Sequence, residues 1–178
     1  MLNLGGNLKF VGGAGSATVE AFNFTGLPPG GGGLSGTTIF GSVDGDNILY
    51  SSLSNAGGLD YQAGLGNETL NASGSKTSDT LAAGPGNVAM TVGSGITDLL
   101  LVQSIIGGAG SVLGGASDSV SGFAGNAGNF VDIMGYASGS GAVTTVSGGS
   151  SLLTLTDGTK ITFENVSSSA LVAAIKYT

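Results

Sequence analysis

The sequence predicts an all-β chain that folds as a parallel β-roll or β-solenoid, and three observations support this. A glycine turn followed by a short strand occurs four times between residues 63 and 102, and its copies start about nine to eleven residues apart. Glycine contributes 36 of the 178 residues without a three-residue period, which indicates turns because glycine adopts positive φ without strain. The chain is also 40% hydrophobic, whereas disordered chains are poor in such residues.

Each copy of the repeated phrase ends on a large apolar side chain. A unit this short cannot bury its apolar face alone, so neighbouring copies are expected to stack and to share one interior. Leu70, Leu81, Met90 and Leu100 are expected to point into that interior. The four copies span residues 63–70, 74–81, 84–90 and 93–100.

The chain is expected to form one domain, residues 1–178, with atypical segments at both ends of the stack. Residues 1–26 alternate like short strands, and 27–36 form a loop because adjacent prolines and a run of glycines do not fit inside a sheet. The repeat region covers residues 37–150 and loosens after residue 102. Residues 151–178 are expected to cap the stack with a β-hairpin around Asp157-Gly158 and a short helix over 170–175.

The phrase Gly64-Leu65-Gly66-Asn67-Glu68-Thr69-Leu70 resembles the nonapeptide of RTX, or haemolysin-type, proteins, G-G-x-G-x-D-x-U-x. In that family paired half-turns form a parallel β-roll, and aspartates of successive turns bind calcium. The matching position holds Glu68 in the first copy, Asp79 in the second, and Val88 or Ala89 in the third. The resemblance therefore implies the fold, with most of the calcium aspartates replaced.

Residues 155–166 are similar to the closing strands of proteins exported by type I secretion, which carry their export signal at the C-terminus. Residues 1–6 lack the basic start and the unbroken apolar run of a conventional leader. The expected location is therefore extracellular or at the cell surface.

Candidate metal ligands are few and scattered. Calcium takes six to eight oxygen ligands, several of them carboxylates. The best local cluster is Asp44, Asp46 and Asn47, and Asp79 and Asp98 are further candidates. The alternative for the cluster is an Asp-Gly turn closed by Asx hydrogen bonds. The expected cofactor is therefore either none or calcium.

Charge and composition exclude several functions. Four lysines, no arginine and eleven carboxylates give a net charge of −7, which opposes binding to nucleic-acid phosphates. No apolar run approaches the length of about 20 residues that spans a bilayer, so no membrane insertion is expected. Histidine and cysteine are absent, which removes catalytic triads and imidazole or thiolate metal sites. No enzymatic activity is expected, although Asp44 and Asp46 leave a carboxylate glycosidase as an alternative.

These observations favour an extracellular bacterial structural or surface protein that self-associates through its glycine-rich β-solenoid into a filament, layer or matrix. Its partners would be further copies of itself and a surface polysaccharide. The alternative is a calcium-responsive RTX-type adhesin or carbohydrate-binding module.

Overall fold

The computed structural model describes residues 9–11, 17–21, 37–40, 47–51, 59–63, 66–73, 78–95, 97–102, 115–123 and 128–178. The strands and helices within these ranges are β1 (Lys9–Val11), β2 (Ala17–Ala21), β3 (Thr37–Phe40), β4 (Asn47–Ser51), β5 (Leu59–Gln62), β6 (Glu68–Asn71), β7 (Asp79–Ala83), β8 (Val88–Thr91), β9 (Thr97–Val102), β10 (Ser117–Ser121), β11 (Phe130–Met134), β12 (Ala142–Thr145), the 3-10 turn η2 (Ser147–Gly149), β13 (Ser151–Thr154), β14 (Lys160–Phe163), α1 (Ser168–Ala174) and β15 (Ile175–Tyr177). The prediction of an all-β chain is confirmed for this part of the molecule.

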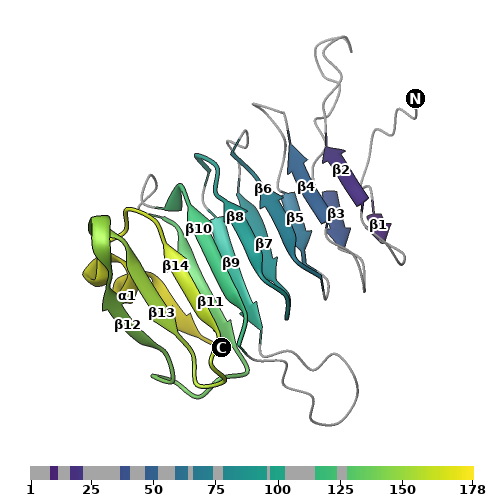
Figure 1. The fold of residues 1–178 in the computed structure, drawn as a ribbon. Helices are drawn as coiled ribbons and strands as arrows, with labels where there is room; N and C mark the ends of the chain where they lie inside the picture. Colours follow the sequence, from purple (N-terminus) through teal and green to yellow (C-terminus); the bar gives the residue numbers. More distant parts are fainter. Residues whose placement is uncertain are drawn as a thin grey trace.

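Consecutive strands alternate between two sheets as far as β11 (Figure 1). The seven-stranded sheet has the order β1-β3-β5-β7-β9-β11-β15, and the eight-stranded sheet has the order β12-β13-β14-β10-β8-β6-β4-β2. Every pair in the seven-stranded sheet is parallel. The eight-stranded sheet is parallel from β2 to β14, and its pairs with β13 are antiparallel.

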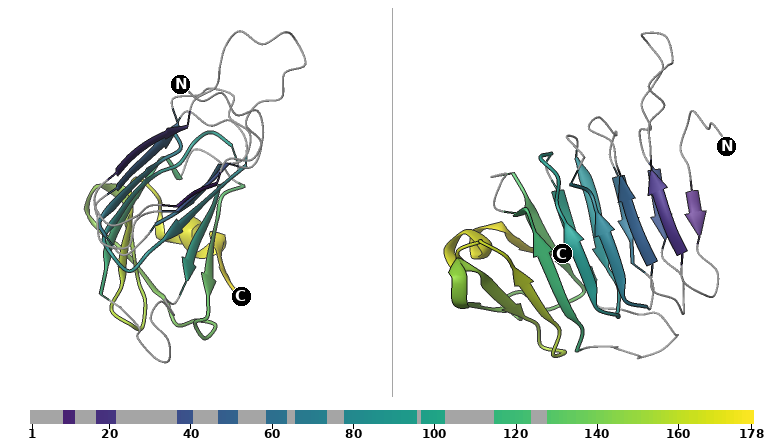
Figure 2. Two further views of the ribbon diagram at one scale, coloured as in Figure 1. Left: turned by 90° about the vertical axis from the view of Figure 1, so that its right-hand side faces the viewer. Right: turned by 45° about the horizontal axis from the view of Figure 1, so that its top comes forward.

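The core lies between the two sheets, which face each other in the left view of Figure 2. Side chains alternate along β6 and β8, so that every second one is buried. Leu70 and Met90 from one sheet and Leu81 from the other are at most 2% exposed and belong to one apolar cluster. Three of the four residues expected to share an interior therefore do so.

The fourth residue, Leu100, holds a different register position. Leu99 pairs with Leu81, and Leu100 pairs with Ala82. Because side chains alternate across a strand, a shift of one residue exchanges the two faces of the sheet. The position equivalent to Leu81 is therefore Leu99, and the side chain of Leu100, expected to point into the interior, is not among those that the structure describes.

The predicted C-terminal hairpin and helix both form. Strands β13 and β14 pair antiparallel around Asp157 and Gly158. The helix begins after Ser167, whose hydroxyl accepts a hydrogen bond from the backbone N–H of Ala170, as an N-cap residue does. Strand β14 also lies beside β10, with Ile161 opposite Asp118, so the hairpin continues the parallel sheet.

Two C-terminal segments differ from the prediction. Residues 139–146, expected to be one more repeat, form β12, which runs antiparallel to β13. The connection through η2 is too short for a parallel crossover, and Gly148 and Gly149 make its turn at φ of 75° and 77°. Residues 175–177, of which Ile175 was expected to end the helix, form strand β15 against β11.

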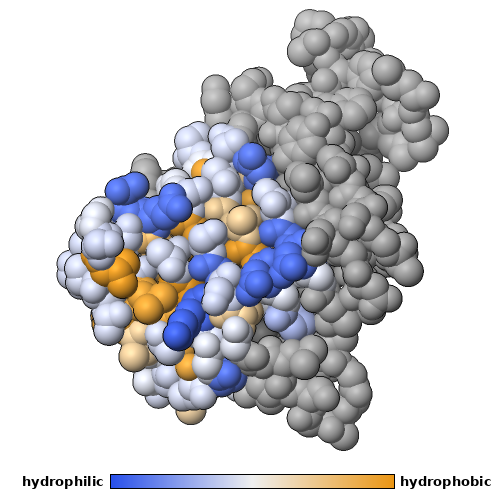
Figure 3. All heavy atoms as spheres, viewed as in Figure 1, coloured by the Kyte–Doolittle hydropathy of each residue, from blue (hydrophilic) through white to orange (hydrophobic). Residues whose placement is uncertain are grey.

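The loop expected at 27–36 lies outside the described residues. No helix in the described part of the chain is long and apolar enough to cross a membrane. The described surface in Figure 3 is largely polar or neutral, and apolar patches appear toward the C-terminal strands.

Candidate functional site

Side chains at the glycine turns link neighbouring strands of the eight-stranded sheet. The backbone N–H of Asn87 donates to Oδ1 of Asn67 at 3.1 Å, and Oδ1 of Asn87 accepts from the N–H of Ser117 at 2.8 Å. Each amide oxygen therefore accepts a hydrogen bond from a backbone N–H at the start of the next strand. We call these two bonds the asparagine ladder; it gives the turns uncharged hydrogen-bond acceptors.

Two strands of the eight-stranded sheet, β6 and β10, carry an acid at their first inward-facing position. Glu68 is opposite Val88 in the strand pairing, and Asp118 follows on the next strand and accepts the Val88 N–H through Oδ1 at 2.8 Å. Glu68 is 3% exposed and Asp118 is 4% exposed. Val88 separates the two carboxylates, so the column does not gather the several adjacent oxygens that calcium needs.

Asp118 is an acid whose burial is not fully compensated by hydrogen bonds. Its Oδ2 is buried and has no hydrogen-bond partner. Burial raises the pKa of Asp118 to about 7, and the hydrogen bond from Val88 opposes this rise. This carboxyl group therefore changes its charge near neutral pH.

The seven-stranded sheet buries a third acid, Asp79, beside a tyrosine. Asp79, at the start of β7, is 3% exposed, and Tyr61 on β5 is 0% exposed. Burial, followed by the negative charge of Asp79, raises the pKa of Tyr61 well above its usual range. Tyr61 therefore stays neutral across the physiological pH range.

The predicted metal ligands do not form a described cluster. Asp44 and Asp46 lie outside the described residues. Asn47 begins β4 in the eight-stranded sheet, whereas Asp79 and Asp98 belong to the seven-stranded sheet. Asp98 pairs with Thr80 rather than with Asp79, so the two aspartates hold different register positions. Within the described residues, no three acidic side chains are grouped in a way that could hold a metal ion.

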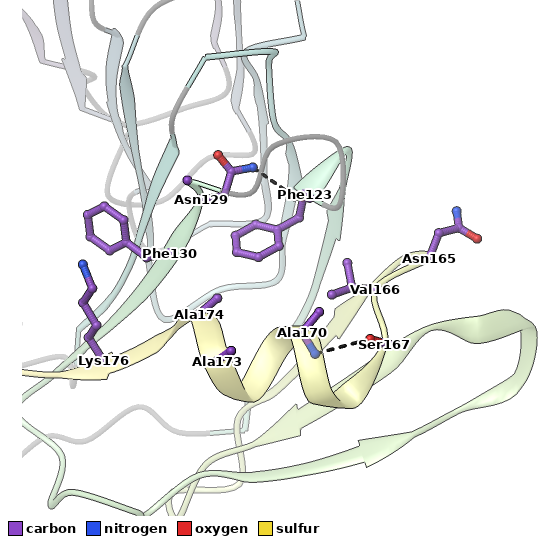
Figure 4. Close-up of a pocket in the computed structure, with 11 residues that line it drawn as sticks. Phe123, Asn129, Phe130, Asn165, Val166, Ser167, Ala170, Ala173, Ala174 and Lys176 are labelled. Atoms are coloured by element: carbon purple, nitrogen blue, oxygen red, sulfur yellow. Dashed lines mark hydrogen bonds between the residues drawn. The ribbon is translucent and has the colours of Figure 1, made fainter.

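A cleft of about 690 Å³ lies between α1 and the strand β11 (Figure 4). Phe123, Val166 and Ala170 give it an apolar floor, and the ammonium of Lys176 lies 3.5 Å from the centre of the Phe130 ring. Asn129 is buried, and its amide nitrogen donates to the Phe123 carbonyl at 3.0 Å. The cleft therefore offers apolar surface and one cation at its rim.

The two ends of the stack differ. At one end, β1 and β2 are the outermost strands of their sheets, and no described strand pairs with their outer edges. At the other end, α1 packs against β12 and β13 and buries Leu171 completely. Unpaired edges offer backbone donors and acceptors to another chain, so the β1–β2 end is the candidate association surface.

The chain has no match among protein-family models, and a search of curated proteins finds no similar sequence. The RTX resemblance therefore stays a prediction from the residues.

Two features of these sites were not predicted from the sequence. The first is the burial of Asp118, which precedes Val120 by two residues as Glu68 precedes Leu70. That spacing was the signal for its buried position. Nothing in the spacing of Phe130 and Lys176 indicates their contact, because β15 itself was missed.

Proposed function

We propose that this chain is an extracellular bacterial structural or surface protein that self-associates into a filament, layer or matrix. Its architecture is an RTX-like parallel β-roll, or β-solenoid, in which the C-terminal hairpin and helix form a cap. The alternation of strands between two sheets and the asparagine ladder, whose first step joins residues 20 apart in the sequence, support this architecture.

The observation that carries the proposal is the pair of edge strands β1 and β2, whose outer edges no described strand covers. A second copy can add strands to both sheets there, since parallel sheets gain hydrogen bonds and continue the core when extended. At the opposite end β15 and β12 are the outermost strands, and α1 packs against β12 and β13. We therefore place the first contact between copies at the β1–β2 end, which no described helix covers.

The experiment is light scattering across protein concentration on three proteins: the wild type, Thr18→Lys and Thr144→Lys. Thr18 on the edge strand β2 has the register position of Ile48 and Thr69. A lysine on an edge strand discourages pairing with another chain. We expect the wild-type mass to rise with concentration and Thr18→Lys to remain monomeric. Thr144, exposed on β12, is the matched control, and Thr144→Lys should still associate. A strictly monomeric wild type contradicts the proposal.

A second candidate function is a binding module for a surface polysaccharide, in the manner of a calcium-responsive adhesin. The cleft beside α1 favours it, because Lys176 provides a cation for an acidic sugar next to apolar surface. Calorimetry with an acidic oligosaccharide should show binding that Lys176→Gln removes and that Lys160→Gln, at an exposed lysine outside the cleft, keeps. Circular dichroism with and without calcium tests the ion requirement, and a fold that forms only with calcium would favour this candidate over the first.

A further inference from the structure

Asp118 is a polar group enclosed by apolar side chains. It is 4% exposed, and Val88 and Ile161, at the same register on the two flanking strands, are 1% and 0% exposed. Its Oδ1 accepts one hydrogen bond from the Val88 N–H, whereas its Oδ2 has no hydrogen-bond partner. A carboxylate in such a place loses hydration without full compensation, so its neutral form is favoured.

The charged groups around Asp118 do not offset this loss. Lys160, the nearest cation along β14, is exposed and pairs with Ser117 rather than with Asp118. Glu164, which follows β14, is exposed as well, and strand β8 carries no charge. Glu68 shares the register of Asp118 but lies two strands away, beyond Val88.

Asp79, on β7 of the facing sheet, is also buried, and two further described acids have hydrogen-bond partners of their own. Asp157, in the β13–β14 turn, accepts from Tyr136 at 2.6 Å, and Asp132 on β11 accepts from Thr178 at 2.7 Å. Burial is accordingly the first cause of the raised pKa of Asp118.

The position of Asp118 gives its charge a structural consequence. Strand β10 is the join between the parallel strands and the C-terminal hairpin, because it pairs with β8 on one side and β14 on the other. We propose that Asp118 is a proton-controlled latch at this join, closed when the carboxyl group is neutral and loosened when it releases its proton to solvent. The ionised carboxylate attracts water, and water reaches Oδ2 only if β8, β10 and β14 separate locally. This property is independent of self-association.

The sign of the effect follows from proton linkage. The pKa of Asp118 is about 7 in the folded protein and 3.8 for an ordinary aspartate, so the folded state holds the proton more tightly. The resulting stability is fully present below about pH 4 and is lost as the pH rises through about 7. A difference of about three pH units changes the unfolding equilibrium constant by up to about a thousandfold.

The test compares the full-length wild type with Asp118→Asn and Glu164→Gln, in buffer with a chelator so that the proton alone varies. Urea unfolding is measured between about pH 5 and about pH 9. Asparagine keeps the acceptor for Val88 but cannot ionise, so the Asp118→Asn profile should lack the fall in stability that the wild type shows as the pH rises to about 7. Glu164→Gln, at an exposed carboxylate, should keep the wild-type fall.

A carboxyl-carbon NMR titration of the wild type supplies the second readout, which decides the matter even if Asp118→Asn does not fold. A midpoint near pH 7 for Asp118, with faster amide exchange of Val88 above that pH after correction for intrinsic rates, supports the latch. A midpoint near the ordinary aspartate value, or an Asp118→Asn profile that matches the wild type, overturns it.

Discussion

The hydroxyl of Tyr177 accepts a hydrogen bond from the backbone N–H of Gly141 at 3.0 Å. Tyr177 lies on β15 of the seven-stranded sheet, and Gly141 immediately precedes β12 of the eight-stranded sheet. A Cβ at position 141 would lie 2.8 Å from Cδ1 of Leu153 and 3.1 Å from the Tyr177 hydroxyl. Because Gly141 has no side chain, the Tyr177 hydroxyl can approach its N–H and link the two sheets at the end where α1 packs.

Tyr177→Phe should destabilise the fold by about 1–2 kcal/mol, because it leaves the half-buried Gly141 N–H without its partner while keeping the ring. The free energy of unfolding from urea titrations followed by circular dichroism measures the change. Val172→Ala on the same helix-capped end is the control, since Val172 is 59% exposed and its truncation should stay within about 0.5 kcal/mol. Equal losses for the two variants would contradict a specific role for the hydroxyl.

The asparagine ladder predicts a difference between two substitutions of Asn87. Asn87→Ala removes the acceptor for the Ser117 N–H and should cost about 0.5–1.5 kcal/mol. Asn87→Asp keeps an oxygen in that place and should retain more of the stability, since a carboxylate also accepts from a backbone N–H. Thermal unfolding of both variants checks this, and an aspartate variant as unstable as the alanine variant would show that the amide oxygen is not the relevant group.

The repeated phrase predicted the strands well because its signal is local. A glycine turn and an alternating strand depend on neighbours in the sequence, and β6, β7 and β8 form where the phrase places them. Register is less local, since a strand such as β9, with three consecutive leucines, fits either face by composition. Only the pairing of Leu99 with Leu81 decides which leucine takes the equivalent position.

The candidate sites were harder to predict because they depend on contacts across the fold. Asn67 and Asn87 each follow a glycine turn of the repeat, but their side chains bond to the next strand rather than to their own turn. The spacing of Asp118 and Val120 indicates that Asp118 faces inward, but its burial also depends on β14 lying beside β10, which no spacing in the sequence indicates. The contact of Tyr177 likewise depends on a long-range pairing, because its strand β15 pairs with β11.

The contact between Tyr136 and Asp157 predicts an effect of acid. The Tyr136 hydroxyl donates to Oδ2 of Asp157 at 2.6 Å, and the Thr159 N–H donates to Oδ1 at 3.0 Å. Burial pushes the pKa of Asp157 upward, but these hydrogen bonds outweigh it and hold the pKa below the ordinary value of 3.8. The stability from this contact is therefore present above pH 3.8 and is lost as the pH falls through the lower, folded value.

Tyr136→Phe should accordingly reduce the free energy of unfolding at neutral pH, and the gap from wild type should narrow in acid below the pKa of Asp157. Asp157→Asn should remove that narrowing, because an amide does not titrate. Urea unfolding at neutral and acid pH measures both variants. A constant gap between Tyr136→Phe and wild type at all pH values would show that the carboxylate charge plays no part.

Two glycines with the same backbone conformation separate conformational strain from steric contact. Gly122 and Gly139 have φ of 80° and 79°. A Cβ at Gly122 would lie 2.7 Å from the carbonyl oxygen of Val92, whereas a Cβ at Gly139 would have no atom within 4 Å.

Gly139→Ala should cost only the left-handed backbone conformation, about 1–2 kcal/mol. Gly122→Ala should cost more, because the Val92 backbone must also move, and the adjacent bond from the Val92 N–H to the Ser121 carbonyl at 3.0 Å moves with it. Urea unfolding measures the free energy of unfolding of the two variants. Equal decreases would mean that the backbone beside Gly122 accommodates an added methyl group without cost.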